Sequence, residues 1–545
     1  MRSRRRWSRV TTAHVLYRVQ LMLVILAGLT IAVTASDNSA AGAGSPKPGG
    51  TAVVGVANDA GMVNPDLTTN SPDSMIGCVI YQGLVAARMD GKIDPLLAKS
   101  WDVSSDGRQY TFHLVNAKWQ DGQDFTSADV KYTLLNVSLK YSAILSRVAK
   151  NIASIDTPDA HTVVVKLNDP YGPFLLSLNC NSGGAILPEH LFQGTDPTKN
   201  PASLQEPVGT GAFRLTDWVR GDHITLSKNP TYWQPGLPRL DKVIFKIIPS
   251  ASSRLLALQS GEVQYLAYDA VQFNDYNTIR SSSKLYLHDE LFPPPDDIMF
   301  FNVRQGPTSI VQVRQALAYA TDTAFLLKTI WFSVGSAGKS SFDSRIAWAY
   351  NPAVDYSRQY ALDTNKAKSL LDAAAFKPGS DGTRFSLNYV VSSGQQPYVD
   401  AGQALKTMWA AVGVSLKLDV VDQNTMVQRV FKDGSFDVTM QGYTTYGDPA
   451  LGIVRQFVSS GIGVPFANAS GYSNPQVDTL AGQGQAAPTQ SQRATYYKQI
   501  QMIIAKDLPS YIVHERTAYD AASKTLHDLW NGHIGYGDWQ IGWLD

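Results

Sequence analysis

The chain has 545 residues, 44% hydrophobic and 17% charged, which is the balance of a water-soluble protein too long for a single hydrophobic core. Six of its 47 basic residues lie within the first 18 positions, and the remainder carries 41 basic against 46 acidic side chains. Outside that start no basic run exceeds two residues, so we expect no nucleic-acid partner, which would need clustered basic side chains.

The N-terminus has the pattern of an export signal. An arginine-rich start is followed by the apolar run 21–35, with Val33 and Ala35 at the small-residue positions that precede a cleavage site. We therefore expect a signal peptide over 1–35, an exported mature protein and a flexible Gly/Pro-rich leader over 36–50. An uncleaved anchor is the alternative, although this run is short of the about 20 residues that span a bilayer. No cysteine follows the run, so a lipoprotein is not expected.

The chain has only two cysteines, Cys78 and Cys180. In an oxidising compartment two cysteines can pair as a disulfide, and two buried free thiols are the alternative. The sequence leaves both open.

Hydrophobic spacing predicts alternating strands and helices along the chain. Thr126 with Asp129 three residues later predicts a capping box, and Arg220-Gly221-Asp222 is the turn of a predicted hairpin. Strands without a strict repeat, mixed with helices, indicate an α/β fold class. In chain order the expected segments are a strand at 51–56, a helix at 71–84, a strand at 110–114, a helix at 126–134, strands at 161–167, 213–218 and 224–226, helices at 311–330 and 365–374, a strand at 385–391, a helix at 398–412 and a strand at 414–421.

Local enzyme motifs are missing from the sequence. The nine histidines form no HExxH or similar ligand spacing, and neither a GxSxG elbow nor a phosphate-binding loop is present. Gly209-Thr210-Gly211 lacks the third glycine of a dinucleotide fingerprint and is expected to be a turn. We expect a binding protein with no catalytic residue, no metal and no cofactor. A secreted hydrolase with two carboxylates from distant loops stays as an alternative.

Several segments resemble the dipeptide/oligopeptide-binding family of ABC importer receptors, known as family 5. The clearest is LLAKSWDVSSDGRQYTFHLVNAKWQDGQDFTSADVKYTL at 96–134. The matches follow the family's order along the chain, and such an ordered series is stronger evidence than one isolated match. The other matching segments are 64–65 with 80–84, 208–233 with 258–263, 299–320, 363–374 and 434–449.

This resemblance implies a two-lobed periplasmic-binding-protein-like fold with an extra subdomain on lobe I and a two-strand hinge. The chain would cross between the lobes near 291–302 and return near 509–518. The implied function is that a monomeric receptor closes on a small solute, a peptide or a saccharide for example, and delivers it to the permease of an ABC importer. A ligand-sensing receptor with the same fold is the alternative. The implied divisions are 51–295 and 512–545 for lobe I, with a subdomain at about 88–205, and 296–511 for lobe II.

The resemblance also implies that ligand-binding residues lie in loops on both sides of an interlobe cleft. Packing is the alternative for Tyr81 and Trp348. Arg345 could meet an anionic group or simply lie on the surface. The candidates are Asn58, Met62, Tyr81, Trp348, Tyr443, Tyr446 and Asp448.

One departure from the family pattern bears on the ligand. Peptide-binding relatives place an aspartate three residues after the aromatic residue of a Gly-Trp element, where it holds the peptide's amino group. Here Gly442-Tyr443 puts Tyr446 at that offset, and the next acid is Asp448. Short peptides with a free amino terminus are therefore not expected to be the best ligands, unless a shortened loop brings Asp448 into the same place.

Overall fold

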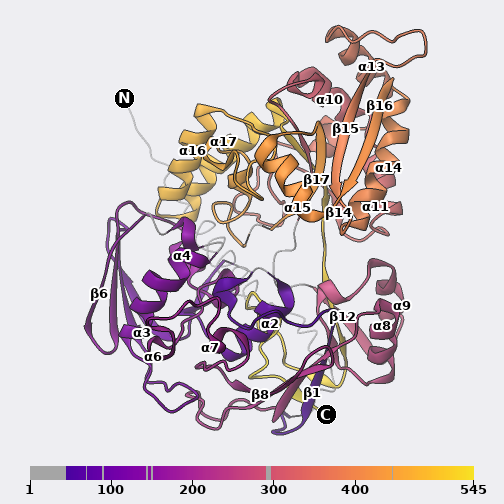
Figure 1. Ribbon diagram of the computed structural model, residues 1–545. Helices are drawn as coiled ribbons and strands as arrows, with labels where there is room; N and C mark the ends of the chain where they lie inside the picture. Colours follow the sequence, from indigo (N-terminus) through magenta and orange to yellow (C-terminus); the bar gives the residue numbers. More distant parts are fainter. Residues whose placement is uncertain are drawn as a thin grey trace, which may run out of the picture. The chain divides into compact units, whose positions relative to one another are not determined.

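The computed structural model describes residues 45–68, 70–88, 91–142, 145–148, 151–289, 296–444 and 446–545. The expected signal peptide over 1–35 and most of the expected leader lie outside these residues. From Pro46 onward the chain forms one compact unit that mixes helices and sheets, as the predicted α/β class requires (Figure 1).

The first large sheet combines segments from both ends of the chain. β1 pairs in parallel with β10 and β11, while β8 and β9 form the predicted antiparallel hairpin. Its order is β12 (Leu285–Asp289), β19 (Tyr519–Ser523), β11 (Tyr265–Leu266), β1 (Thr51–Val56), β10 (Lys242–Ile247), β9 (His223–Lys228) and β8 (Phe213–Val219).

The second large sheet is made from one continuous stretch of the chain. Its order is β14 (Ser336–Ala337), β18 (Ser510–Glu515), β13 (Asp296–Phe301), β17 (Val438–Tyr443), β15 (Phe385–Ser392) and β16 (Val414–Val421). Every residue of β13 is buried, because alternate side chains enter two different cores on the two faces of the sheet.

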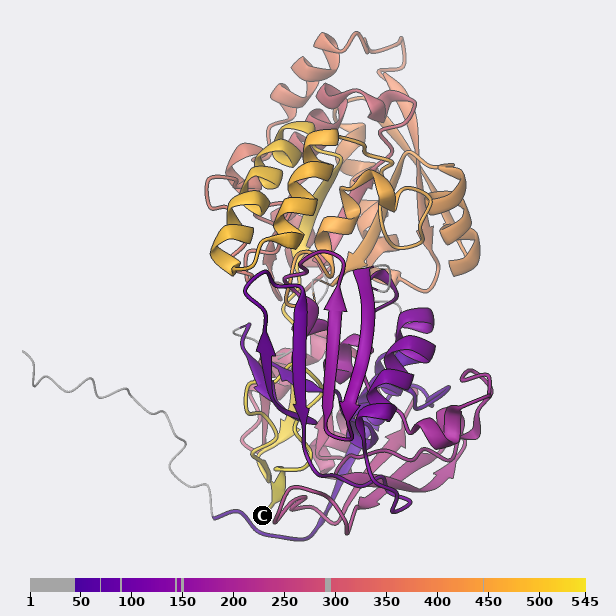
Figure 2. The ribbon, with the colours of Figure 1, turned by 90° about the vertical axis from the view of Figure 1, so that its left-hand side faces the viewer.

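A four-stranded antiparallel sheet lies between β3 and β8 in the chain, and it faces the viewer in purple in Figure 2. Thr126 and Asp129 form the predicted capping box at the start of α3 (Ser127–Tyr132), which lies between β5 and β6 in the chain. The sheet has the order β4 (Ala98–Val103), β5 (Gln109–Leu114), β7 (Thr162–Leu167) and β6 (Ile152–Asp159), and two short pairs are β2 (Val85–Ala87) with β3 (Ile93–Pro95) and β20 (Leu526–His527) with β21 (Trp543–Leu544).

Helices cover the sheets. In Figure 1, α16 and α17 lie side by side next to the second sheet. The helices are α2 (Ser71–Ile80), α3 (Ser127–Tyr132) with a π-helical continuation (Thr133–Ser138), α4 (Leu139–Tyr141), α5 (Phe174–Ser177), α6 (Glu189–Phe192), α7 (Pro201–Leu204), α8 (Ala251–Ser260), α9 (Tyr276–Arg280), α10 (Val311–Tyr319), α11 (Thr323–Thr329), α12 (Tyr356–Gln359), α13 (Thr364–Ala373), α14 (Gln396–Ala410), α15 (Gln423–Val427), α16 (Pro475–Ala486) and α17 (Gln490–Asp507).

Two predicted helices differ from the structure. The helix predicted over 71–84 ends at Ile80, where Tyr81 caps it with an N–H bond to the carbonyl oxygen of Gly77 (2.7 Å). The helical spacing over 311–330 is divided into α10 and α11, because Asp322 caps a new helix by accepting a bond from the Phe325 N–H (2.9 Å).

The chain passes between the two large sheets twice, from β12 to β13 and from β18 to β19. We call residues 46–289 with 519–545 the first-sheet region, and residues 296–515 the second-sheet region. The first passage follows Asp289 and ends before Asp296, and the second lies between Glu515 and Tyr519; the crossings near 291–302 and 509–518 stay predictions. β18 spans Ser510–Glu515, and the lobe limits given by the sequence stay predictions.

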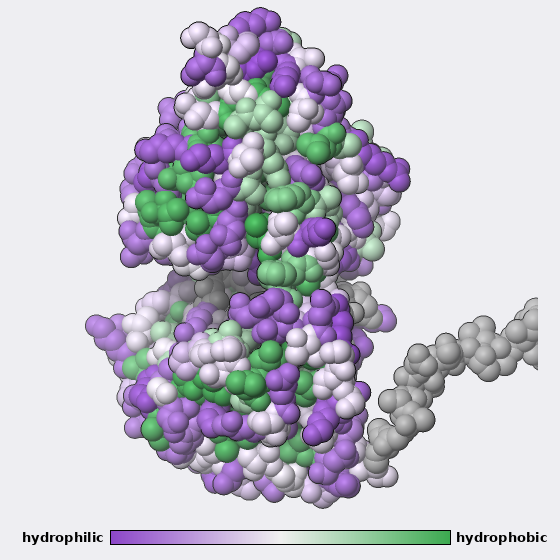
Figure 3. Space-filling view, turned by 90° about the vertical axis from the view of Figure 1, so that its right-hand side faces the viewer, coloured by the Kyte–Doolittle hydropathy of each residue, from purple (hydrophilic) through white to green (hydrophobic). Residues whose placement is uncertain are grey.

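Cys78 on α2 and Cys180 form a disulfide, so the first of the two alternatives left by the sequence is the one realised. It fastens α2 to the segment that follows α5 within the first-sheet region. Across the described residues, no helix combines the length and apolar character needed to cross a membrane. Hydrophobic and hydrophilic residues are interspersed on the face shown in Figure 3.

Candidate functional site

The ends of three neighbouring strands meet where the chain enters the second sheet. Asp296 at the start of β13 lies opposite Tyr443 on β17 and opposite Glu515 on β18. All three side chains are buried. The predicted site residue Tyr443 therefore adjoins the passage between the two sheets.

Arg345 joins the carboxylates at this passage. Its Nε donates to Asp343 Oδ1 (2.8 Å), and its Nη2 donates to Asp343 Oδ2 (2.5 Å) and to Asp296 Oδ1 (3.2 Å). Its Nη1 donates to the carbonyl oxygen of Arg516, in the return passage. Arg345 thus links the first residue of β13 to the return passage, with 35% of its side chain exposed. Burial, with the nearby Asp343 charge, raises the pKa of Asp296 and of Glu515.

A second ionic group surrounds Asp297. Its Oδ1 accepts bonds from Arg516 Nη2 (2.7 Å) and the Tyr398 hydroxyl (2.7 Å), and its Oδ2 faces His514 Nδ1 (2.7 Å). Burial alone would raise the pKa of Asp297, but Arg516 and His514 lower it to about 2. The other nitrogen of His514 faces the carbonyl oxygen of Val334 (2.7 Å).

These carboxylates bear on the hydrolase alternative, which requires acids that converge and reach a substrate. Asp296, Asp343 and Glu515 converge, but each is at most 2% exposed. Asp343 is held by Arg345, and Glu515 accepts bonds from Ser344 Oγ (2.6 Å) and Lys339 N–H (3.2 Å). All three carboxylates are thus buried and bonded within the chain.

The segment from Tyr443 to Asp448 connects the second sheet to the first-sheet region. The Tyr443 hydroxyl donates to the carbonyl oxygen of Ala467 (2.9 Å), and burial raises the pKa of this phenol. Tyr446 is half-buried with a positive φ of 50° and packs against a core that includes Ile534 of the first-sheet region. A Cβ on Gly447 would lie 3.4 Å from Ile534 Cδ1.

Asp448 is fully engaged by Arg493 on α17. Arg493 Nη1 donates to Asp448 Oδ2 (2.6 Å) and Nη2 to Oδ1 (2.5 Å), and both side chains are at most 5% exposed. The guanidinium also lies 5.2 Å from the centre of the Trp348 ring. The structure therefore brings Trp348 and Asp448 together through an arginine that was not among the predicted residues.

The remaining candidates lie in the first-sheet region. Asn58 is exposed and Met62 half-buried, both in the loop after β1. Tyr81 is fully buried, and its hydroxyl donates to the carbonyl oxygen of Ala202 (2.7 Å), so its contacts are those of a packed core residue.

Sequence reasoning missed Arg493 and the acids around Arg345. Arg493 lies 45 residues from Asp448, and no local spacing signals such a pair. Asp343 had a detectable signal, since it stands two residues before Arg345, where an Asp–Arg pair can close a local turn.

Two sheets of mixed strand direction, linked by two passages and bridged by the 443–448 segment, define a two-lobed solute-binding protein. The family model of bacterial extracellular solute-binding proteins, family 5 (middle region), matches residues 92–463, more than half of the chain. The chain belongs to this family, whose members are receptors that bind peptides or similar solutes for ABC importers.

Known relatives extend the match over most of the chain. The probable D,D-dipeptide-binding periplasmic protein DdpA of Escherichia coli K12 is 28% identical over 483 residues, covering 87% of this chain and 90% of the relative. The binding protein AgaA of A. tumefaciens R10, solved with agropinic acid, is 25% identical with a TM-score of 0.74 and covers 91% of this chain and 99% of its own. CtaP of Listeria monocytogenes reaches a TM-score of 0.79 at 24% identity, covering 91% and 100%.

Proposed function

We propose that the protein is exported, works as a monomer and captures a small solute between its two sheet regions before delivering it to an ABC permease. The two passages between the sheets supply the hinge, and the 443–448 segment supplies a wall that touches both regions. The arginine-rich start and apolar run support export. A relative whose name specifies a periplasmic D,D-dipeptide-binding protein, 28% identical to the chain, supports the same location.

Short peptides with a free amino terminus are not its preferred ligands. The observation that carries this proposal is the bidentate bond from Arg493 to both oxygens of Asp448. Burial costs a ligand ammonium several kcal/mol of hydration, and only a free carboxylate nearby can compensate this loss. Asp448 is not free, because Arg493 already balances its charge. Tyr446, which stands where peptide-binding relatives place their acid, has a phenol that stacks or hydrogen-bonds but does not balance the charge.

Calorimetry of the native protein against a mixed di- to pentapeptide library tests this proposal. We expect no micromolar binding. Tyr446→Asp restores a carboxylate at a backbone position with positive φ, which Asp tolerates better than Tyr, and is expected to create peptide binding that amino-terminal acetylation abolishes. Tyr446→Asn is the matched uncharged control and should gain nothing.

Micromolar binding of free peptides by the native protein, lost on acetylation, would restore the peptide-receptor assignment. Native mass spectrometry of the purified protein identifies a solute that co-purifies. With that compound added back to stripped protein, small-angle scattering should show a smaller radius of gyration, and an unchanged radius at saturation would remove the hinge mechanism. N-terminal sequencing of the exported protein should begin near Ser36, and a mature form beginning at Met1 would contradict cleavage.

A further inference from the structure

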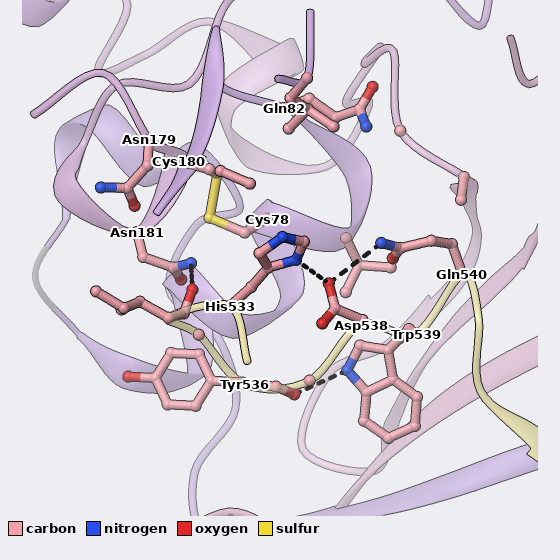
Figure 4. A pocket seen from close by; sticks show the side chains of 18 of the residues that line it. Cys78, Gln82, Asn179, Cys180, Asn181, His533, Tyr536, Asp538, Trp539 and Gln540 are labelled. Carbon is pink, nitrogen blue, oxygen red and sulfur yellow. Dashed lines mark hydrogen bonds and ion pairs between the residues drawn. A yellow bond between two sulfur atoms is a disulfide. The ribbon is translucent and has the colours of Figure 1, made fainter. Parts of the chain in front are cut away.

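A cavity of about 320 Å³ lies within the first-sheet region, between α2 and the C-terminal segment 531–541 (Figure 4). One water needs only about 10–15 Å³ of such space, and pockets for small molecules begin near about 300 Å³. All residues that line the cavity belong to the first-sheet region, and the Cys78–Cys180 disulfide forms part of its wall. Its occupancy therefore does not depend on the second-sheet region.

Two buried amide oxygens in the wall have no donor among the described residues. Asn179 is 3% exposed, and its Nδ2 donates to the carbonyl oxygen of Leu176 (2.5 Å) and to Ser182 Oγ (2.8 Å), while its Oδ1 has no partner. Asn181 Nδ2 donates to the carbonyl oxygen of Ile534 (2.9 Å), and its Oδ1 is likewise unpaired. Because a buried acceptor without a donor costs free energy, the wall favours a ligand that donates hydrogen bonds.

The charges around the cavity are balanced. His533 and Asp538 bond each other (3.0 Å), and the other ring nitrogen of His533 lies 3.0 Å from Asp94 Oδ2, which also accepts from Arg88 (3.1 Å). Burial would lower the pKa of His533, but Asp538 and Asp94 raise it. Both carboxylates beside the cavity are thus already bonded to basic side chains, which leaves neither of them free for a cationic ligand.

Aromatic rings and further amides complete the lining. Gln82 Nε2 donates to the Tyr232 hydroxyl (3.1 Å), which donates onward to Gln234 Oε1 (3.1 Å). The Trp539 indole N–H donates to the carbonyl oxygen of Tyr536 (3.1 Å), leaving its ring as an apolar surface of the wall. A neutral wall of amides and rings is suited to a molecule with both hydroxyl groups and an apolar face.

We propose that this cavity is a second binding site, for a small neutral polyhydroxylated molecule of the monosaccharide, disaccharide or cyclic polyol class, whose hydroxyls donate to Asn179 and Asn181. The site is separate from the solute site between the sheets. Its ligand is held inside one region and stays bound whether or not the two regions approach each other.

Saturation-transfer NMR and calorimetry test the proposal with glucose, galactose, maltose and myo-inositol, and with glutamate and putrescine as charged comparators. The native protein is expected to bind at least one neutral compound and neither charged one. Asn181→Leu removes one acceptor, and Val79→Phe fills the cavity from α2 without removing a hydrogen bond. Each substitution should raise the dissociation constant by about tenfold or more, because the first removes a hydrogen bond to the ligand and the second removes the volume that the ligand occupies. Asn365→Leu, an exposed substitution on α13, is the matched control.

Several results would overturn the proposal. Absence of binding by any neutral compound to the native protein at millimolar concentration would mean that the cavity holds water only. Equal affinity in correctly folded Asn181→Leu and Val79→Phe proteins would place the ligand elsewhere. Loss of sugar binding in Tyr446→Ala would place the sugar in the solute site, whereas unchanged binding in that variant supports a separate site, independently of the solute that the importer carries.

Discussion

Arg493 and Asp448 are joined by two parallel N–H···O hydrogen bonds, with N···O distances of 2.6 and 2.5 Å, and at most 5% of either side chain is exposed. Arg493 also donates from Nε to the carbonyl oxygen of Gly484 (2.8 Å) and from Nη2 to the Tyr497 hydroxyl (2.9 Å). Burial would lower the pKa of Arg493, but Asp448 raises it. The pair ties the 443–448 segment to α16 and α17.

Asp448→Asn is therefore expected to lower the free energy of unfolding by about 3–5 kcal/mol, because it leaves a buried guanidinium without its counter-charge. The double variant Asp448→Leu/Arg493→Met should recover part of that loss. Urea unfolding followed by fluorescence measures both. Asp169→Asn breaks an exposed Arg108–Asp169 pair and should leave the midpoint nearly unchanged. An equally small effect at Asp448 would show that the pair is not closed in solution.

Reduction of the Cys78–Cys180 disulfide should lower stability by about 2–5 kcal/mol, because the bond closes a long loop that the unfolded chain would otherwise open. The two cysteines are 102 residues apart. Urea curves with and without dithiothreitol provide the measurement. The Cys78→Ser/Cys180→Ser variant should have the same urea unfolding curve as the reduced protein, and dithiothreitol should not change that curve. Coincident curves for the native protein in both conditions would mean that the thiols are free.

Gly209 is required by a close approach of backbones. A Cβ at this position would lie 1.9 Å from the carbonyl oxygen of Ile80, at the end of α2. Gly209→Ala should destabilise the protein by about 1–3 kcal/mol or more, since backbone has to move. Gly482→Ala on α16 meets nothing within 4 Å and should be neutral or slightly stabilising. Equal melting temperatures for the two variants would disprove the close approach.

The pH dependence of stability should contain a contribution from Asp66. Burial raises the pKa of this carboxyl to about 8, whereas its value in the unfolded chain is near 4. The folded state therefore keeps a proton that the unfolded state releases. The contribution of Asp66 to the free energy of unfolding is thus fully present below about pH 4 and is lost as pH rises to about 8. The loss is at most about 1.4 kcal/mol per pH unit.

Asp66→Asn, which resembles the protonated acid in shape and cannot ionise, removes this contribution. Its thermal stability relative to the native protein should rise steadily between pH 5 and pH 8. The difference between the two proteins isolates Asp66 from the other buried acids. Parallel stability curves would show that the carboxyl is ionised in the folded protein.

The sequence predicted most of the secondary structure because the information is local. Val414–Val421 and Thr51–Val56 form strands with the predicted bounds, and the Arg220-Gly221-Asp222 turn joins a hairpin. The break between α10 and α11 was missed, since apolar spacing alone does not weigh the cap that Asp322 offers against helix continuation.

The site was less accessible to sequence reasoning because its contacts are distant in the chain. Tyr446 was singled out by its offset of three residues from Tyr443, a local feature, and the structure places it against the first-sheet region. The partner of Asp448 could not be found in this way. The same is true of Arg345, for which a surface position was an open alternative and which instead holds Asp296 and Asp343.

The two large sheets differ in how the chain supplies their strands. All six strands of the second sheet come from 296–515 without interruption, whereas the place between β12 and β11 in the first sheet is filled by β19, at 519–523. As the polypeptide emerges from the ribosome, every strand of the second sheet precedes the one strand that joins β12 to the rest of the first. The later half of the molecule is thus able to complete its sheet before the earlier half, and β12 lacks the strand that joins it to the first sheet until residues 519–523 become available to pair.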